Sequence, residues 1–76
     1  MEKKGVEMFH SRLKFYREEK GLSQSQLAKA SGISVRLIQA YECGLRDING
    51  ARVITALKLA DALGCDVRQI INEVRD

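Results

Sequence analysis

The chain has 76 residues, of which 45% are hydrophobic and 30% charged, and a formal net charge of +3. This composition is typical of a small globular domain and excludes an intrinsically disordered chain. The sequence has no apolar run long enough to span a membrane, and the basic Lys3 and Lys4 are not followed by the apolar stretch of a secretory signal. We therefore expect one compact domain over residues 1–76, with residues 1–6 flexible.

The side chains that could support redox, metal or catalytic chemistry are few. A secreted domain of this size would usually carry about four cysteines or more. The two present, Cys43 and Cys65, therefore predict reduced thiols in a cytoplasmic protein. His10 is the one histidine and no CxxC pair is present, so no metal site is expected. The sequence also lacks a Ser-His-Asp set and a phosphate-binding glycine loop, and we predict no catalytic residue, no cofactor and no small-molecule effector.

Charge is unevenly distributed along the chain. Residues 8–58 carry nine basic and four acidic side chains, whereas residues 59–76 carry two basic and four acidic ones. A basic body with an acidic tail fits a fold with one face that binds a polyanion. The asymmetry is weak support on its own, because solvated helical surfaces often differ by a few charges.

The first expected helix spans residues 7–20. Phe9, Leu13 and Tyr16 recur at helical spacing, and Gly21 is placed to end the helix in a left-handed conformation. The next helix, over residues 24–31, has clear start signals. Ser23 and the glutamine at position 26 form a capping-box pattern, and leucines at positions 22 and 27 have the spacing of a hydrophobic staple.

A third helix is expected over residues 35–43, after the turn formed by residues 31–34. Ser34 can cap this helix, and the turn is too short for an antiparallel pair, so the two helices must cross steeply as in a helix-turn-helix. Its inward side is predicted to hold Ile38, Tyr41 and Leu45. Its outward side would carry Arg36, Gln39, Ala40 and Cys43, which are small or able to form hydrogen bonds.

The remainder predicts a loop and two more helices. Residues 45–50 read as the loop. The helix over residues 51–63 is apolar nearly all round, which is typical of a helix at the centre of a core. Asp66 and Gln69 form a second capping-box pattern before a final helix. The apolar residues of these two helices are Val53, Ile54, Ala56, Leu57, Leu59, Ala60 and Leu63, then Val67, Ile70, Ile71 and Val74.

Residues 21–44, GLSQSQLAKASGISVRLIQAYECG, resemble the phage Cro and repressor type helix-turn-helix family, also called XRE. Residues 56–71, ALKLADALGCDVRQII, are similar to the fourth and fifth helices of that family. The resemblance implies an all-α, compact five-helix lambda-repressor-like fold with the helix-turn-helix at residues 23–43. It also implies a homodimer that binds double-stranded DNA at an operator with an inverted repeat and regulates transcription, with repression as the expected outcome.

The family implies that the third helix lies in the major groove of DNA, with residues near its N-terminus at the base edges. Arg36 can make a bidentate contact to guanine, Gln39 can do the same to adenine, and Val35 can pack on a thymine methyl group. The alternative for Arg36 and Gln39 is that they are ordinary exposed polar side chains. The positions that match the base-reading residues of the family are Val35, Arg36, Leu37, Gln39 and Ala40.

Other positions match residues that contact the DNA backbone or support the fold. Gln24 matches the position where the N-terminus of the second helix meets a phosphate, because free amide groups and the helix dipole suit an anion there. Arg17 and Glu42 match a pair that in relatives forms a partly buried ion pair between the first and third helices. The residues predicted for phosphate contacts are Ser23, Gln24, Ser34, Arg46 and Asn49, with Ser23 chiefly a cap and Arg52 a weaker candidate.

The sequence departs from the family pattern at three places. Cys43 replaces a polar or basic residue often used for the DNA backbone, and Ala40 is small where relatives often have a longer side chain. The loop over residues 45–51 is longer than in the shortest family members. These departures put the contact at Cys43 and the assignments within the loop in doubt.

The competing interpretation is a protein-interaction module, such as an antitoxin or an adaptor, that uses the same fold. Phe15, Leu37 and the outer side of the last helix are apolar candidates for such a surface. They could equally form the interface of a homodimer, which we favour. A purified homodimer that shifts duplex DNA would support the regulator, and a monomer indifferent to DNA would support the module.

Overall fold

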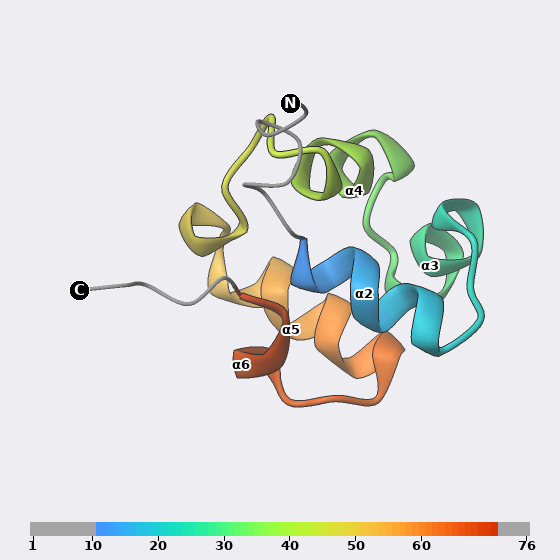
Figure 1. Ribbon diagram of the computed structural model, residues 1–76. Helices are drawn as coiled ribbons and strands as arrows, with labels where there is room; N and C mark the ends of the chain where they lie inside the picture. Colours follow the sequence, from blue (N-terminus) through green and yellow to red (C-terminus); the bar gives the residue numbers. More distant parts are fainter. Residues whose placement is uncertain (1–10, 72–76) are drawn as a thin grey trace, which may run out of the picture.

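The computed structural model describes residues 11–71, in which there are five α-helices, one 3-10 helix and no strand (Figure 1). The expectation that residues 1–6 are flexible lies outside these residues, as do the predicted positions of Phe9 and Val74. The predicted all-α class is confirmed. The elements in chain order are α2 (Arg12–Glu19), α3 (Gln24–Ser31), α4 (Val35–Glu42), η1 (Ile48–Gly50), α5 (Val53–Leu63) and α6 (Val67–Ile70).

The start of α2 corrects the predicted helix over residues 7–20. Ser11 has an extended backbone, with φ −77° and ψ 119°, and its side-chain oxygen accepts a hydrogen bond from the Lys14 amide at 3.0 Å. A residue in this capping conformation stands outside the helix that it starts. A continuous helix through position 11 is therefore wrong, and the first described helix begins at Arg12.

Glycines end α2 and α3 as the sequence predicts. Gly21 and Gly32 have φ of +78° and +77°, a left-handed conformation that glycine adopts without steric penalty. After α2, the Leu22 amide donates to the carbonyl of Arg17 at 3.1 Å. This is the 6→1 hydrogen bond of a Schellman motif, which spans more of the chain than the second bond of that motif. After α3, the chain turns at Gly32, and α4 begins three residues later at Val35.

The predicted caps of the helix-turn-helix are confirmed. The Ser23 side-chain oxygen accepts from the Gln26 amide at 3.0 Å, and the Gln26 side-chain oxygen accepts from the Ser23 amide at 2.8 Å. Ser34 starts α4 in the same way, accepting from the Leu37 amide at 3.1 Å. These bonds satisfy amides that have no partner within their own helices. The starts of α3 and α4 are therefore fixed by side chains next to the turn that joins them.

The core draws one fully buried aliphatic side chain from every α-helix of the described chain: Leu13, Leu27, Ile38, Leu59 and Ile70. The helix α3 packs against α4 and α5, while α2 packs against α4 and α6. Burying one such side chain contributes roughly 1.5–3 kcal/mol. No helix within residues 11–71 is long and apolar enough to cross a bilayer.

The loop after α4 corrects one predicted core position. Leu45 was expected on the inward side but is 79% exposed. The helix ends at Glu42, and Gly44 has φ +84°, so helical periodicity does not continue to position 45. Within the predicted loop over residues 45–50, the chain forms the 3-10 helix η1, and its Ile48 is buried in the core.

The helix α5 is only partly at the centre of the core. Ala56, Leu59, Ala60 and Leu63 are buried, as predicted. The expectation that this helix lies at the centre of the core holds for one side only, because Val53, Ile54 and Leu57 are 75%, 53% and 41% exposed. Among the described helices, α3 and α6 pack most extensively on α5, and these side chains of its first two turns stay exposed.

Candidate nucleic-acid interface

The outer side of α4 carries most of the residues predicted to read bases. Arg36 and Gln39 are exposed, and Val35 and Ala40 are half-buried. Leu37 is also half-buried, but it differs from Val35 and Ala40 because it packs against the hydrophobic core. The surface predicted to contact bases is therefore the side of α4 on which Arg36 and Gln39 lie.

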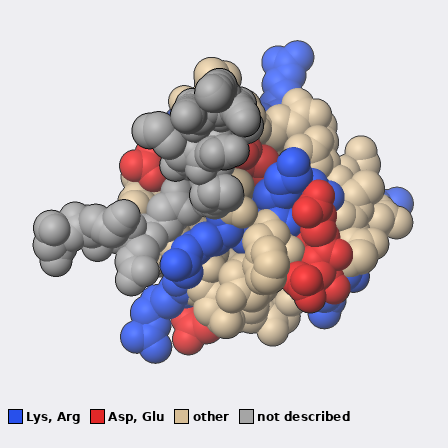
Figure 2. Space-filling view, in the orientation of Figure 1, with Lys and Arg blue, Asp and Glu red and all other residues tan. Residues whose placement is uncertain are grey.

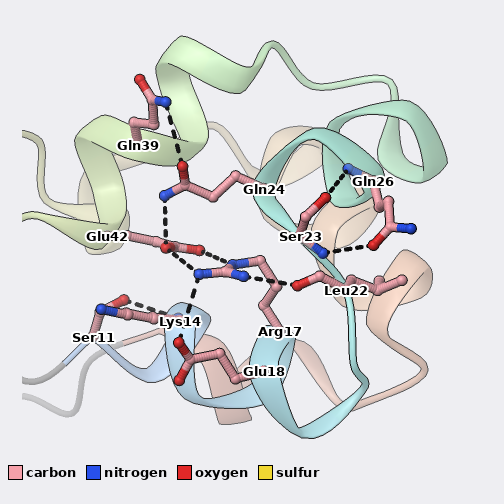
Figure 3. A network of polar contacts seen from close by, with 10 residues as sticks. All are labelled: Ser11, Lys14, Arg17, Glu18, Leu22, Ser23, Gln24, Gln26, Gln39 and Glu42. Carbon is pink, nitrogen blue, oxygen red and sulfur yellow. Dashed lines mark hydrogen bonds and ion pairs between the residues drawn. The ribbon is translucent and has the colours of Figure 1, made fainter.

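A buried ion pair fixes α4 from beneath. Arg17 donates from Nε to Oε2 of Glu42 at 2.7 Å and from Nη2 to Oε1 at 3.0 Å (Figure 3). The two side chains are 10% and 4% exposed. Arg17 Nη1 also donates to the Leu22 carbonyl at 2.7 Å, so one guanidinium group joins α2, α4 and the segment that leads into α3. The hydrogen bond to Glu42 raises the pKa of Arg17 and outweighs burial, which lowers that pKa.

The ion pair extends into a chain of two glutamines. Gln24 Nε2 donates to Oε1 of Glu42 at 3.0 Å, and Gln39 Nε2 donates to Oε1 of Gln24 at 3.3 Å. In Figure 3 these side chains form one continuous path from the ion pair to the exposed side of α4. The structure thus brings together Gln24, predicted for phosphate, and Gln39, predicted for bases. This contact has no signal in a local sequence pattern, because it depends on how two helices meet.

The residues predicted for phosphate contacts lie on two segments. Ser23 and Ser34 both serve as caps through their side-chain oxygens. Arg46 and Asn49 are exposed in the segment between α4 and α5, where the Asn49 amide donates to Asp47 Oδ1 at 2.9 Å. Within residues 11–71 the structure gives no acceptor to the backbone amide of Gln24, the first residue of α3. That amide belongs to the group that points out of a helix N-terminus.

Charge on the side of the molecule that carries α2 is mixed. Figure 2 shows Lys and Arg groups interspersed with Asp and Glu groups on this side. Interspersed charges of both signs give no uniformly positive field. The excess of basic residues in the sequence therefore does not form a positively charged patch on this face that would suit a polyanion.

The two cysteines are free thiols in different surroundings. Cys43 is exposed at the end of α4, and its Sγ donates to the Ala40 carbonyl at 3.7 Å. Cys65 is half-buried, and burial is the main cause that raises the pKa of its thiol. In the described chain, no three His, Cys, Asp or Glu side chains gather into a group that could hold a metal ion.

Comparison with known proteins gives a family and a solved relative. The family described as Helix-turn-helix matches residues 13–70, which is more than half of the chain. Among solved structures, the restriction-modification controller protein C.AhdI from Aeromonas hydrophila has 37% sequence identity and a TM-score of 0.70. That match covers 79% of this chain and 86% of the controller chain. No curated protein matches the sequence.

Proposed function

Since the chain belongs to the Helix-turn-helix family of DNA-binding transcriptional regulators, we propose that it reads one operator sequence in the major groove with the outer side of α4. The match and the solved relative confirm the family resemblance and the five-helix lambda-repressor-like fold. The observation that carries the proposal is the exposure of Arg36 and Gln39 on a helix held in place by the buried ion pair.

Two exposed side chains supply the hydrogen bonds that base reading needs. The guanidinium group of Arg36 can donate twice to the acceptors of guanine, and the amide of Gln39 can pair with adenine. Val35, at the first position of α4, is placed to pack on a thymine methyl group. Ala40 adds shape and apolar contact beside them, whereas Leu37 packs against the core and supports the helix from within. A fixed helix reduces the ordering that binding requires, because its side chains start near the bound arrangement.

Contacts to the DNA backbone set the position of the reading helix. The N-terminus of α3 presents the free amide of Gln24, and the dipole of the helix favours a phosphate there. Ser23 and Ser34 can add hydroxyl contacts while they cap. Arg46 and Asn49, with Arg52, are exposed after α4 and supply contacts that raise affinity without reading sequence.

We further propose that the protein binds as a homodimer through the open side of α5. Val53, Ile54 and Leu57 occupy positions that share one side of a helix, and all three are exposed. Apolar side chains gathered on one side gain free energy when a second copy removes them from water. To read an inverted repeat in successive major grooves, a twofold dimer must hold its two copies of α4 about 34 Å apart.

The solved relative supports a regulatory function over the protein-interaction module. C.AhdI is a restriction-modification controller, and this chain shares 37% of its residues over the aligned part. We propose that this protein likewise acts in the cytoplasm as a controller of transcription, with repression as the expected outcome at its own operator. The position of the selected operator relative to restriction-modification genes tests the likeness in function.

Selection from a random duplex library tests the proposal. Purified protein should enrich an inverted repeat, and its preference for that site over scrambled DNA should persist as salt rises. Binding to scrambled DNA should fall steeply with salt, because it depends on phosphate contacts alone. Enrichment of no sequence, with all binding lost at higher salt, would refute operator reading and favour the protein-interaction module.

A further inference from the structure

We infer that Glu42, acting through Gln24, fixes the orientation of the Gln39 amide so that Gln39 reads adenine and rejects guanine. The inference rests on the proposed function, in which Gln39 faces a base edge. It assigns to Glu42 and Gln24 a positioning role in base preference that is separate from the contribution of the ion pair to folding.

The orientation begins at the Glu42 carboxylate. An ionised carboxylate only accepts hydrogen bonds. Here it accepts from Arg17 at 2.7 and 3.0 Å, and from Gln24 Nε2 at 3.0 Å. If the Gln24 amide were reversed, its carbonyl oxygen would face the carboxylate oxygen with no hydrogen between them. Gln24 must therefore present its NH₂ group to Glu42.

The orientation of the Gln24 amide in turn determines the orientation of the Gln39 amide. With its NH₂ group at Glu42, the Gln24 amide has its carbonyl oxygen left for its other neighbour. Gln39 Nε2 lies 3.3 Å from that oxygen and donates to it. One N–H and the side-chain oxygen of Gln39 then remain without a partner within the described chain. What Gln39 offers to an outside group is one donor and one acceptor.

This remaining pair of groups distinguishes the two purines. In the major groove, adenine presents the acceptor N7 beside the donor N6, whereas guanine presents two acceptors, N7 and O6. One donor and one acceptor match adenine. Against guanine, the Gln39 oxygen would face O6 without a hydrogen, and its second N–H is held by Gln24. The reverse amide orientation would offer both N–H groups and would match guanine instead.

Burial of the Arg17–Glu42 ion pair stabilises this orientation of the two glutamine amides. The Glu42 side chain is 4% exposed and the Arg17 side chain 10%, so water cannot readily replace either partner. Arg17 is held in turn by the Leu22 carbonyl at 2.7 Å. Reversing Gln24 would leave a buried carboxylate facing an acceptor, which is unfavourable because unsatisfied buried charge is strongly destabilising. The amide of Gln39 is thus set before DNA arrives.

The substitution Gln24→Lys tests the inference by reversing the chain of hydrogen bonds. A lysine only donates, so it can pair with Glu42 and donate to the oxygen of Gln39, which then turns both N–H groups outward. Library selection followed by competition binding should show the base pair read by Gln39 changing from adenine to guanine. We expect the adenine-to-guanine affinity ratio at that pair to change by about tenfold or more.

Three further variants make the result unambiguous. Gln24→Met removes both hydrogen bonds and should bring the two purines toward equal affinity without reversing the preference. Ser25→Lys adds the same charge at the neighbouring exposed position and should keep the adenine preference while strengthening binding to all DNA. Gln39→Met identifies the base pair, because preference should be lost there and nowhere else. Circular dichroism and thermal unfolding establish that each variant folds.

The outcomes separate the inference from the proposed function. If Gln39→Met changes preference at no base pair, Gln39 does not read a base and the inference is overturned, while the proposed function stands as long as the library selection still yields an operator. If Gln39→Met identifies a pair but Gln24→Lys and Gln24→Met keep full adenine preference there, base reading stands and the positioning role is wrong. Should Gln24→Lys fail to fold, full adenine preference in Gln24→Met alone contradicts the inference.

Discussion

The outer side of α4 and the open side of α5 are both exposed, but they are built from opposite chemistry. Arg36 and Gln39 on α4 are polar, and Gln39 is tied through Gln24 to a buried ion pair. The open side of α5 carries apolar side chains at Val53 and Ile54 with no such polar support. The first surface suits a partner that offers hydrogen-bonding groups in fixed places, whereas the second suits a partner that excludes water.

The contrast also gives a physical reason why the two proposed interfaces of one small domain would not mix. A buried charge network makes the polar side directional, because each donor needs an acceptor in a given place. The apolar side is less directional, because its stabilisation depends on the area removed from water. We therefore expect substitutions on one side to leave the function of the other side intact.

The largest effect is expected at the ion pair beneath α4. Glu42→Ala should lower the free energy of unfolding by about 3–5 kcal/mol, because it leaves the buried guanidinium of Arg17 without its partner. Urea unfolding at neutral pH measures the change. The double variant Arg17→Met with Glu42→Leu is the control and should recover much of the loss, since neither charge remains. A single variant as stable as the wild type would contradict a buried, coupled pair.

The next effect concerns the open side of α5. Ile54→Glu combined with Leu57→Glu should weaken the dimer by about 2 kcal/mol or more, because like charges would face each other across an apolar contact. Sedimentation over a range of protein concentrations measures the dissociation constant. Phe15→Glu is the matched control on α2, where Phe15 is also exposed, and it should leave the dimer intact. Dissociation caused by the control alone would place the interface on α2.

A smaller effect is expected at the reading side of α4. Arg36→Ala should weaken binding to the selected site by about 1–3 kcal/mol and relax preference at one base pair. Arg46→Ala serves as the comparison, because a phosphate contact weakens all sequences alike and lowers the salt slope by about one. Titrations of selected and random duplexes at several salt concentrations distinguish the two. If Arg36→Ala weakened binding to the selected and random duplexes equally, Arg36 would contact phosphates and not bases.

The smallest effect is expected at the N-terminal cap of α6. Asp66 caps α6, and the hydrogen bond from the Arg68 amide lowers the pKa of its carboxyl group. The stabilisation is present above the ordinary pKa of about 3.9 and is lost as pH falls through the lowered value. Asp66→Asn keeps a capping oxygen that does not titrate. Its thermal midpoint should fall less than that of the wild type between pH 7 and pH 3, and an equal fall would contradict the assignment.

Local signals in the sequence predicted the fold well. Capping patterns at Ser23, Ser34 and Asp66 act over three residues, so the sequence contains all of their partners. The glycine ends of α2 and α3 are local in the same sense. The Ser11 cap was missed because the apolar spacing around it continues as if one helix passed through it.

Tertiary features of the molecule could not be predicted in this way. Whether Leu45 or Ile48 is buried depends on where α4 ends and how the next segment turns back to the core. The apolar side of α5 has the pattern of a core helix, because the sequence does not tell which helices cover it. The hydrogen bond between Gln24 and Glu42 likewise depends on the packing of α3 against α4. The DNA contacts of the individual residues stay predictions.

Methylation interference on the selected duplex tests the central claim most directly, because the methyl group at guanine N7 lies in the major groove and that at adenine N3 in the minor groove. We predict interference at N7 positions in two half-sites about 34 Å apart, as expected for two copies of α4 in successive major grooves. Interference confined to adenine N3, or to one half-site alone, would contradict a dimer that reads its operator with α4.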